Sequence, residues 1–260
     1  DNNISSNNQY GVHITISENI TVSKNKVLFN NQGVILERTI HSSIVNNTVS
    51  KNNEGGIELR SAGNTKVREN VLTSNKEYGF RLDSTGKCVL KNNVMKDNGL
   101  ILFNDELKKA ESNIIDTSNT VNGGSIYYLK NRSAETIPSD AGQVILLNCD
   151  DMIVENLTLS NCSVGIEILF PHNNIIRDNT IRNVSYGIYI FESSNNIVKN
   201  NELYSNHGYG IFLSASNKNR LMNNDVFDFE FGFIIIGSGQ SDIPSNNNLL
   251  IGNTVSNNEY

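Results

Sequence analysis

The chain lacks the residues that mark several classes of protein. Its 260 residues include no Trp, three Pro and three Cys. Three cysteines cannot supply a disulfide framework for a chain of this length, and so few prolines exclude a Pro-rich linker or a collagen. No apolar run approaches the roughly 20 residues that a membrane-spanning helix needs. The sequence therefore predicts no insertion into a membrane.

A basic excess is also missing. The formal net charge is −6, from 21 Lys and Arg against 27 Asp and Glu, and no basic stripe occurs that could follow a phosphate backbone. We therefore expect no nucleic-acid partner. The first residues, DNNISSNNQY, contain neither a basic segment nor an apolar one of the kind found in signal peptides. We expect the chain to be a fragment of a longer protein.

The residue that the chain has in excess is asparagine, with 45 copies. Asparagine-rich composition is typical of disordered, aggregation-prone tracts. However, 37% of the residues are hydrophobic and 18% are charged, which is enough apolar material for a core. The distribution of the asparagines along the chain therefore decides between these interpretations.

A step of the form Gly-apolar-x-apolar recurs along the chain. Its glycines are Gly11, Gly33, Gly56, Gly79, Gly99, Gly165, Gly187, Gly210 and Gly232. They are spaced by 22, 23, 23 and 20 residues and then by 22, 23 and 22 residues. Asparagine keeps the same period at Asn25, Asn47, Asn70, Asn93, Asn156, Asn179, Asn201, Asn224 and Asn253, and again at Asn30, Asn52, Asn75, Asn98, Asn161 and Asn206. We expect these asparagines to stack as buried amide ladders.

Each repeat holds three short alternating runs and no helical period, which predicts three strands per repeat. About ten such repeats of 22–23 residues predict an all-β parallel β-helix that spans residues 1–260 as one domain. A leucine-rich repeat has an overlapping period, but the apolar anchors here are mostly Ile and Val. The repeat is interrupted by an excursion over residues 104–143, in which Asn122-Gly123-Gly124 is a turn signal and residues 125–129 resemble a strand.

Residues 195–206, NNIVKNNELYSN, followed by Gly210-Ile211-Phe212-Leu213, resemble the NosD-like family of right-handed β-helix proteins, which overlaps carbohydrate-binding and sugar-hydrolase repeat domains. Residues 121–131 and 137–149 resemble a segment found in archaeal cell-surface members of that family. The family includes carbohydrate-processing enzymes, surface-layer components and accessory factors. A methanogen enzyme that disperses cell aggregates by cutting their matrix polysaccharide is similar in kind. The resemblance implies a right-handed β-helix and a secreted or cell-surface protein that works on carbohydrate.

Outward positions of the Gly-apolar-x-apolar strands are the candidate functional positions, because alternate residues of a strand point to opposite faces. In the first half of the chain these positions hold the charged residues Glu37, Glu58, Arg60, Arg81 and Asp83. Carboxylates on neighbouring strands could act as the acid and base of a glycoside hydrolase, and a carboxylate beside Arg could serve a uronate-cleaving lyase. The structural alternative is an alternating-sign ion ladder that keeps a solvated face soluble.

In the second half the same positions are apolar and aromatic. Tyr189, Phe191, Phe212 and the single acid Glu167 are the candidate sugar-binding residues. An apolar face of this length is unusual on a soluble monomer. Three explanations remain open: the excursion covers it, a second subunit covers it in a homo-oligomer, or it is a platform for sugar stacking. The ends of the coil stack offer a second route to oligomers.

Metal ligands are not grouped in the sequence. The four His and three Met residues are scattered, which predicts no copper site, and turn carboxylates such as Asp150, Asp151 and Asp242 leave calcium open without a specific pattern. No cofactor is expected. Two functions follow: a polysaccharide-binding or scaffolding domain, or a polysaccharide-degrading enzyme that uses the charged residues.

Overall fold

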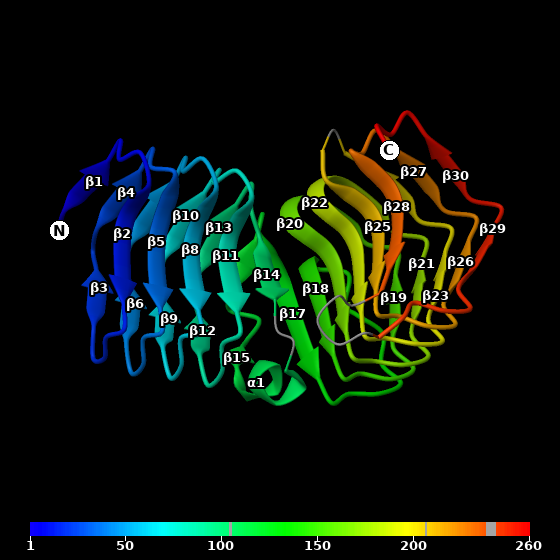
Figure 1. Cartoon of the computed structure of the whole chain (residues 1–260), viewed down its shortest axis with the longest axis horizontal. Helices are drawn as coiled ribbons and strands as arrows, with labels where there is room; N and C mark the ends of the chain where they lie inside the picture. Colours follow the sequence, from blue (N-terminus) through cyan, green and yellow to red (C-terminus); the bar gives the residue numbers. More distant parts are fainter. Residues whose placement is uncertain (104–105, 206, 238–242) are drawn as a thin grey trace. The chain divides into compact units, whose positions relative to one another are not determined.

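The computed structural model of the chain describes residues 1–103, 106–205, 207–237 and 243–260. Its contacts group into two compact units (Figure 1). Unit 1 comprises Asp1–Ile126 and Asn161–Ser163, and unit 2 comprises Tyr127–Ser160 and Val164–Tyr260. Both units are parallel β-solenoids built from coils of three strands, which confirms the predicted fold class. The prediction that residues 1–260 form one domain stays a prediction.

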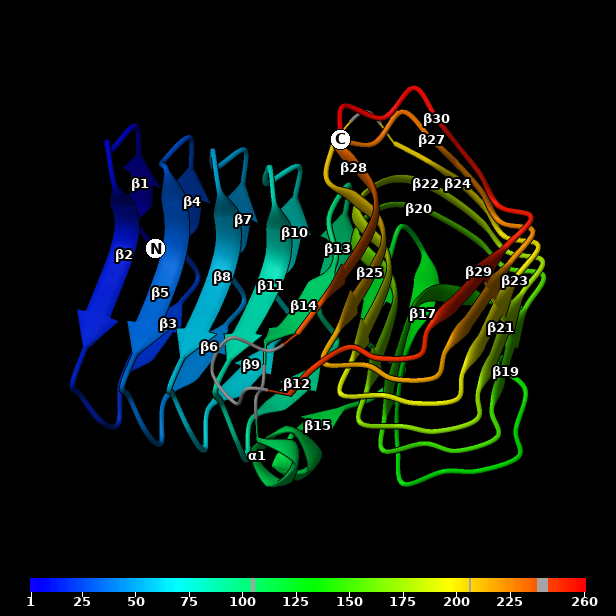
Figure 2. The ribbon, with the colours of Figure 1, turned by 45° about the vertical axis from the view of Figure 1, so that its right-hand side comes forward.

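Unit 1 has a long sheet and two short sheets. The long sheet contains β2 (Tyr10–Thr15), β5 (Gln32–Glu37), β8 (Gly55–Arg60), β11 (Tyr78–Asp83) and β14 (Leu100–Phe103). One short sheet contains β3 (Thr21–Ser23), β6 (Ser43–Val45), β9 (Lys66–Arg68), β12 (Val89–Lys91) and β15 (Ile114–Ile115). The other contains β1 (Asn3–Ser5), β4 (Lys26–Leu28), β7 (Thr48–Ser50), β10 (Val71–Thr73), β13 (Val94–Lys96) and β16 (Thr120–Val121). Figure 2 shows one coil passing through β2, β3 and β4.

Unit 2 repeats this plan, except that two strands run through a corner of the coil. The long-sheet positions belong to β18 (Ala141–Leu147), to the second halves of β20 (Thr158–Leu169) and β22 (Thr180–Phe191), and to β25 (Tyr209–Ser214) and β28 (Phe231–Ile236). The first half of β22 pairs with β24 (Glu202–Tyr204), followed by β27 (Asp225–Phe227) and β30 (Thr254–Ser256). The remaining short sheet contains β19 (Ile153–Glu155), β21 (Ile175–Arg177), β23 (Ile197–Lys199), β26 (Arg220–Met222) and β29 (Leu249–Ile251).

The excursion contains a short helix, a hairpin and a partial coil. The helix α1 (Leu107–Ser112) was not expected from the sequence. β16 and β17 (Gly124–Lys130) pair antiparallel around Asn122 and Gly123, which both have positive φ, so the predicted turn is confirmed as a two-residue hairpin. After β17 the chain runs parallel to the first coil of unit 2, with bridges from Ser133 to Asp150 and from Thr136 to Ile153.

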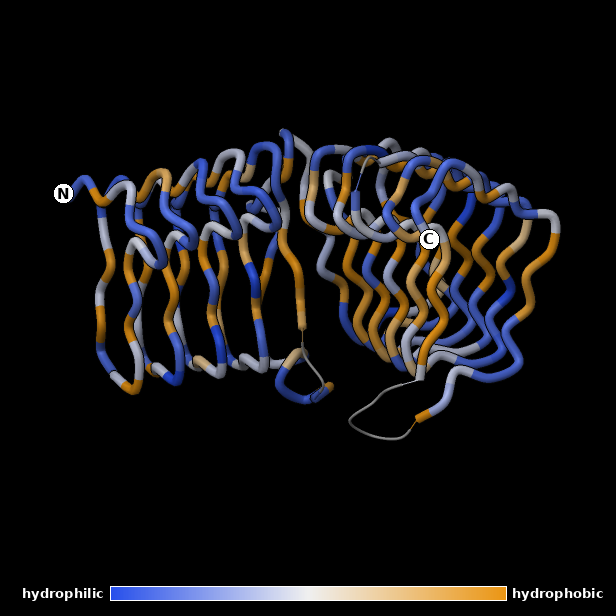
Figure 3. Tube along the Cα trace, turned by 45° about the horizontal axis from the view of Figure 1, so that its top comes forward, coloured by the Kyte–Doolittle hydropathy of each residue, from blue (hydrophilic) through white to orange (hydrophobic). Residues whose placement is uncertain are grey.

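The alternation of side chains in the long strands explains the core. In β8, Ile57 and Leu59 are fully buried in the core of unit 1, while Glu58 and Arg60 point outward. Figure 3 shows the same alternation as hydrophobic and hydrophilic segments along the tube. Strand registers such as Ile57 with Phe80 and Glu58 with Arg81 confirm the columns expected from the sequence.

At the recurrent glycine two consecutive residues of the long strand, the glycine and the residue after it, face the core. In β11 the N–H groups of both Gly79 and Phe80 donate to the carbonyl of Gly99, at 2.9 and 3.0 Å, which is the pattern of a β-bulge. A side chain at this position would collide with the core. At Gly165, for example, an added Cβ would lie 2.8 Å from both the carbonyl oxygen of Gly187 and the side chain of Ile181. The bulge also turns the residue before the glycine outward.

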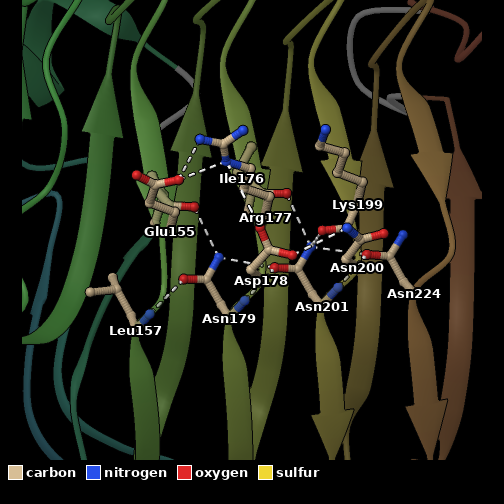
Figure 4. Close-up of polar contacts among 11 residues, drawn as sticks. Glu155, Leu157, Ile176, Arg177, Asp178, Asn179, Lys199, Asn200, Asn201 and Asn224 are labelled. Atoms are coloured by element: carbon tan, nitrogen blue, oxygen red, sulfur yellow. Dashed lines mark hydrogen bonds and ion pairs between the residues drawn. The ribbon is translucent and has the colours of Figure 1, made fainter.

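Buried asparagine ladders connect the coils, as predicted. In unit 2 the Oδ1 atom of Asn201 accepts from the backbone N–H of Asn179 at 3.1 Å and from its Nδ2 at 2.9 Å (Figure 4). Asn201 repeats both bonds to Asn224 in the next coil. In unit 1 the equivalent ladder runs through Asn25, Asn47, Asn70, Asn93 and Asn119.

Two of the predicted ladder positions are wrong by one residue. Leu157, not Asn156, occupies the ladder position, and its N–H donates to Asn179 (Figure 4). Asn156 and Asn161 are instead exposed residues with φ of 57° and 50°, Asn156 in a bend and Asn161 inside β20. Asparagine suits that left-handed conformation as well as it suits the ladder, so its identity alone could not fix the position. Asn206 lies outside the described residues.

Removing a central ladder amide should destabilise unit 1. Asn70 accepts two hydrogen bonds from Asn47, and its Nδ2 donates to the carbonyls of Ile44 and Arg68. Asn70→Ala leaves these buried groups unpaired, at about 1–3 kcal/mol for each unsatisfied group. We expect the free energy of unfolding, measured in urea, to fall by more than about 2 kcal/mol. Asn53→Ala is the control, because Asn53 is exposed and outside the ladder, and an equal loss in both variants would contradict the prediction.

Candidate functional site

The charged face of unit 1 consists of His13, Glu37, Glu58, Arg60, Arg81 and Asp83, all outward residues of the long sheet. Its two columns follow the predicted register: Glu58 pairs with Arg81, and Arg60 lies between Glu37 and Asp83. Ion pairs connect the five acidic and basic residues: Glu37–Arg60 at 3.9 Å, Arg60–Glu58 at 2.8 Å, Glu58–Arg81 at 3.6 Å and Arg81–Asp83 at 3.4 Å. Nε2 of His13 lies 3.6 Å from the Glu37 carboxylate. The structure therefore brings all five predicted catalytic residues together.

Glu58 is the centre of this face and is only 1% exposed. Its Oε1 accepts from Nη2 and Nε of Arg60 at 2.8 and 3.1 Å, and its Oε2 accepts from the hydroxyl of Tyr78 at 3.1 Å. Burial alone would lower the pKa of Arg60, but the charge and hydrogen bond of Glu58 raise it above its usual value. Both oxygens of this carboxylate are thus already occupied within the protein.

Tyr78 is a member of this site that the sequence did not reveal. It precedes Gly79, and the bulge turns its side chain outward. Its ring lies over Gly55 of the preceding coil, where an added Cβ would collide with it. Burial, followed by the negative charge of Glu58, raises the pKa of Tyr78, so the hydroxyl remains protonated and donates. Aromatic residues before the repeat glycine, as at Tyr10 and Tyr186, were the available signal.

The chemistry of this face is that of an alternating ion ladder. Acidic and basic side chains alternate from Glu37 through Arg60, Glu58 and Arg81 to Asp83, and every one has a partner of opposite charge. Arg81 also lies against the ring of Phe103, at 4.6 Å from its centroid. A substrate could reach the Glu58 carboxylate only if Arg60 or Tyr78 moved. The five residues stay predicted catalytic residues, in a setting that favours the structural alternative.

The aromatic face of unit 2 consists of the outward residues Tyr186, Tyr189, Phe191, Tyr209, Phe212, Ser214, Phe231, Ile234 and Ile236 on β22, β25 and β28. Phe212 is half-buried and packs against Tyr189 at 5.5 Å and Tyr209 at 5.3 Å between ring centroids. Phe191 is also half-buried, and its ring centroid lies 6.4 Å from that of Tyr189. Two of the four predicted binding residues, Phe191 and Phe212, therefore present part of their rings to solvent.

The other two predicted binding residues are covered. Glu167 is fully buried and Tyr189 is 9% exposed. Burial and the nearby Glu167 charge raise the pKa of Tyr189. Outward residues of the first two coils, such as Ile145 and Leu169, are buried as well. The open part of the face thus begins at Phe191 and continues over β25 and β28, and the apolar stripe expected from the sequence is only partly exposed.

A ring ladder runs along the edge of the aromatic face, at the position before the repeat glycine. Tyr186 stacks on Tyr209 with centroids 4.9 Å apart, Tyr209 on Phe231 at 5.2 Å, and Phe231 on Tyr260 at 5.0 Å. The interplanar angles are 18°, 11° and 21°. Strict strand alternation would place these rings inward, so the bulge again explains why the sequence did not reveal them.

Comparison with family models decides the family. A model described as periplasmic copper-binding protein (NosD) matches residues 1–115 and 96–260. The chain belongs to the NosD family. This confirms the resemblance inferred from residues 195–213. Comparison with curated protein sequences gives no significant match.

Solved structures with a similar fold are distant from this NosD-family chain. The A-module of a mannuronan C-5 epimerase of Azotobacter vinelandii matches at 12% identity with a TM-score of 0.36, over 92% of this chain and 65% of the module. The Dettilon tailspike protein matches at 15% identity and a TM-score of 0.37, over 96% of this chain and 60% of that protein. A catalytic domain of a GH87 α-1,3-glucanase matches at 12% identity with a TM-score of 0.35, over 92% of this chain and 46% of that domain. The chain thus spans less than two thirds of these proteins.

The donor groups of this NosD-family chain do not fit a copper site. Among residues 1–103, 106–205, 207–237 and 243–260, no group of three or more His, Cys, Asp or Glu side chains could hold a metal ion. Met95 and Met152 are buried in the core, and burial raises the pKa of Cys88 to about 11 and of Cys162 to about 12, which keeps both thiols protonated. Copper needs imidazole, thiolate or thioether ligands gathered at one point.

Calcium binding by turn carboxylates stays a prediction. The Asp150 carboxylate accepts the backbone N–H of His172 at 2.8 Å, Asp151 is an exposed turn residue, and Asp242 lies outside the described residues. In the part of the chain that the structure describes, no helix is both long and apolar enough to cross a membrane.

The contact between Tyr78 and Gly55 can be tested by a double-mutant cycle. Gly55→Ala adds a methyl group beneath the Tyr78 ring, so we expect a loss of about 1–3 kcal/mol in the free energy of unfolding. In a Tyr78→Ala background this penalty should be at least about 1 kcal/mol smaller. Gly63→Ala is the control, because an added Cβ there has no neighbour closer than 3.5 Å. Equal penalties for Gly55→Ala in both backgrounds would contradict the contact.

Proposed function

We propose that this NosD-family chain is a polysaccharide-binding or scaffolding domain that works outside the cell or at its surface. The observation that carries the proposal is the open aromatic face of unit 2. Phe191, Phe212 and Phe231 are half-buried on three neighbouring strands. The strand register pairs Tyr189 with Phe212, and it pairs the hydroxyl-bearing ring of Tyr209 with Phe231. The apolar faces of sugar rings pack on aromatic side chains, and exposed patches of this kind mark binding surfaces.

The alternative, a polysaccharide-degrading hydrolase or lyase, would use the charged face of unit 1. Proton transfer requires a carboxylate or base within hydrogen-bond reach of the substrate. Glu58 is buried, and both its oxygens accept hydrogen bonds from Arg60 and Tyr78. Binding therefore fits the geometry better than catalysis does. An oligomer formed through the aromatic face or the coil ends stays a prediction.

Loss of one ring should weaken binding. Phe212→Ala should reduce affinity about 2- to 10-fold, because an aromatic contact contributes about 0.5–1.5 kcal/mol. Affinity electrophoresis of the purified chain in gels that contain soluble polysaccharides measures the effect. Tyr204→Ala is the matched control, since Tyr204 is an exposed aromatic residue on the short strand β24. If no polysaccharide retards the wild-type chain, or if both variants lose affinity equally, the proposal is wrong.

The charged face gives the test of catalysis. Glu58→Gln removes the charge that Arg60 and Arg81 share, so we expect a loss of about 1.5–3 kcal/mol in stability and unchanged polysaccharide affinity. Incubation with neutral and uronate-rich polysaccharides, scored for new reducing ends and for unsaturated products, detects hydrolase or lyase activity. Activity in the wild type that disappears in a folded Glu58→Gln variant would favour the enzyme over the binding domain.

A further inference from the structure

The aromatic face lacks a partner for an anionic sugar. We propose that the polysaccharide bound there is uncharged, and that this face discriminates against uronate-rich polymers. This inference rests on the proposed binding function and specifies its ligand class. It depends on which charges lie on the face and around it.

The face itself carries no cation. Its described outward residues are aromatic or aliphatic apart from Ser214, and none is Lys or Arg. A sugar carboxylate placed against these rings would lose hydration without gaining a counter-charge, and such a desolvated charge costs several kcal/mol. Recognition of sugar carboxylates normally uses Arg in a bidentate geometry. A neutral pyranose needs no such partner, because its hydroxyl groups stay in water while its apolar face meets the rings.

Acidic residues border the same strands. Glu192 follows Phe191 at the end of β22, and the exposed Glu230 immediately precedes Phe231. Glu259 is also exposed and adjoins Glu230 on the next coil, because the Tyr260 N–H donates to the carbonyl of Glu230 at 2.9 Å. Glu230 and Glu259 adjoin the rings of Phe231 and Tyr260, so these like charges would repel an anionic polymer at that end of the ring ladder.

The basic residues on these long strands and on the turns directly after them are few. Arg182, in the first half of β22, is ion-paired with Glu202 at 3.0 Å. Lys218 lies on the turn beyond β25. Over the whole of unit 2 the sequence has 7 Lys and Arg against 14 Asp and Glu, a net charge of −7. Unit 1 has 14 against 13, a net charge of +1. The surface with the open rings therefore belongs to the acidic unit.

The spacing of the ring ladder suits a polymer. Its rings follow one another at 4.9, 5.2 and 5.0 Å, one ring per coil. A chain of sugars that runs along the direction of coil stacking would meet an equivalent surface at every coil. The cost of desolvating a sugar carboxylate against a ring would likewise recur at every coil. A repeating negative charge is therefore penalised more than a single one.

A matched pair of polymers tests the inference. A soluble neutral glucan and a soluble neutral mannan are each compared with the same polymer oxidised at C6 to carboxylates, by affinity electrophoresis of the whole chain. At low salt we expect at least about 10-fold weaker binding of the oxidised polymer. At about 1 M salt the ratio should shrink, because the Debye length falls to about 3 Å. An oxidised polymer that binds at low salt as tightly as its parent, or more tightly, overturns the inference and leaves the binding function intact. If no polymer binds, both are overturned.

A charge-adding variant extends the test. Ile236 is 46% exposed on β28, in register with Ser214, and Leu249 is 44% exposed on the short strand β29. Ile236→Lys should increase affinity for the oxidised polymer several-fold at low salt, whereas Leu249→Lys makes the same change in net charge on another face and should have no effect. Urea midpoints verify that both variants fold. An equal gain in both variants, or no gain for Ile236→Lys, overturns the inference.

Discussion

The hydrogen bonds of buried asparagine side chains hold the coils in register. Each ladder amide forms hydrogen bonds with turn groups that would otherwise need water as their partner. Asn47, for example, donates to the carbonyls of Val22 and Val45 and to Oδ1 of Asn70. A buried polar group left unpaired is costly, so a coil shifted by one residue would lose several such bonds at once. The same constraint explains the composition. Of the 45 asparagines, 16 are buried, and another 16 described asparagines have left-handed φ.

Because the ladders and the apolar core use the inward positions, few places are left for function. Many turn residues must accept a left-handed conformation, and the short strands of the inner coils turn only two of their three residues outward. The long strands have room for more outward residues. In unit 1 these residues satisfy one another: Glu58 is surrounded by Arg60, Arg81 and Tyr78, all from the same face. In unit 2 they are mostly aromatic and aliphatic side chains, for which water is a poor solvent.

The period of the glycines was sufficient to predict the fold, the register and both outward columns, because a solenoid converts sequence spacing directly into stacking. The parts that could not be predicted have physical causes. The bulge at the glycine turns Tyr78 and Tyr186 outward, against the strict alternation of a regular strand. Asparagine is suitable for both the ladder and the left-handed turn, so Asn156 could not be distinguished from its neighbour Leu157. The burial of Glu58 and Glu167 depends on side chains from other coils, which the position of an acid within its own repeat does not indicate.

The two faces also differ in what a bound ligand would have to displace. On the charged face a ligand would compete with ion pairs already in place, such as the 2.8 Å contact between Arg60 and Glu58, and the protein would lose nearly as much as the complex gained. On the aromatic face a ligand would displace only water from Phe191, Phe212 and Phe231, which contributes favourably to binding. The face has no cation to offset the desolvation of a carboxylate, and acidic residues border it. Selectivity therefore depends on whether the polymer carries negative charge. A surface of this kind can be specific for a class of sugar without any hydrogen bond that identifies one.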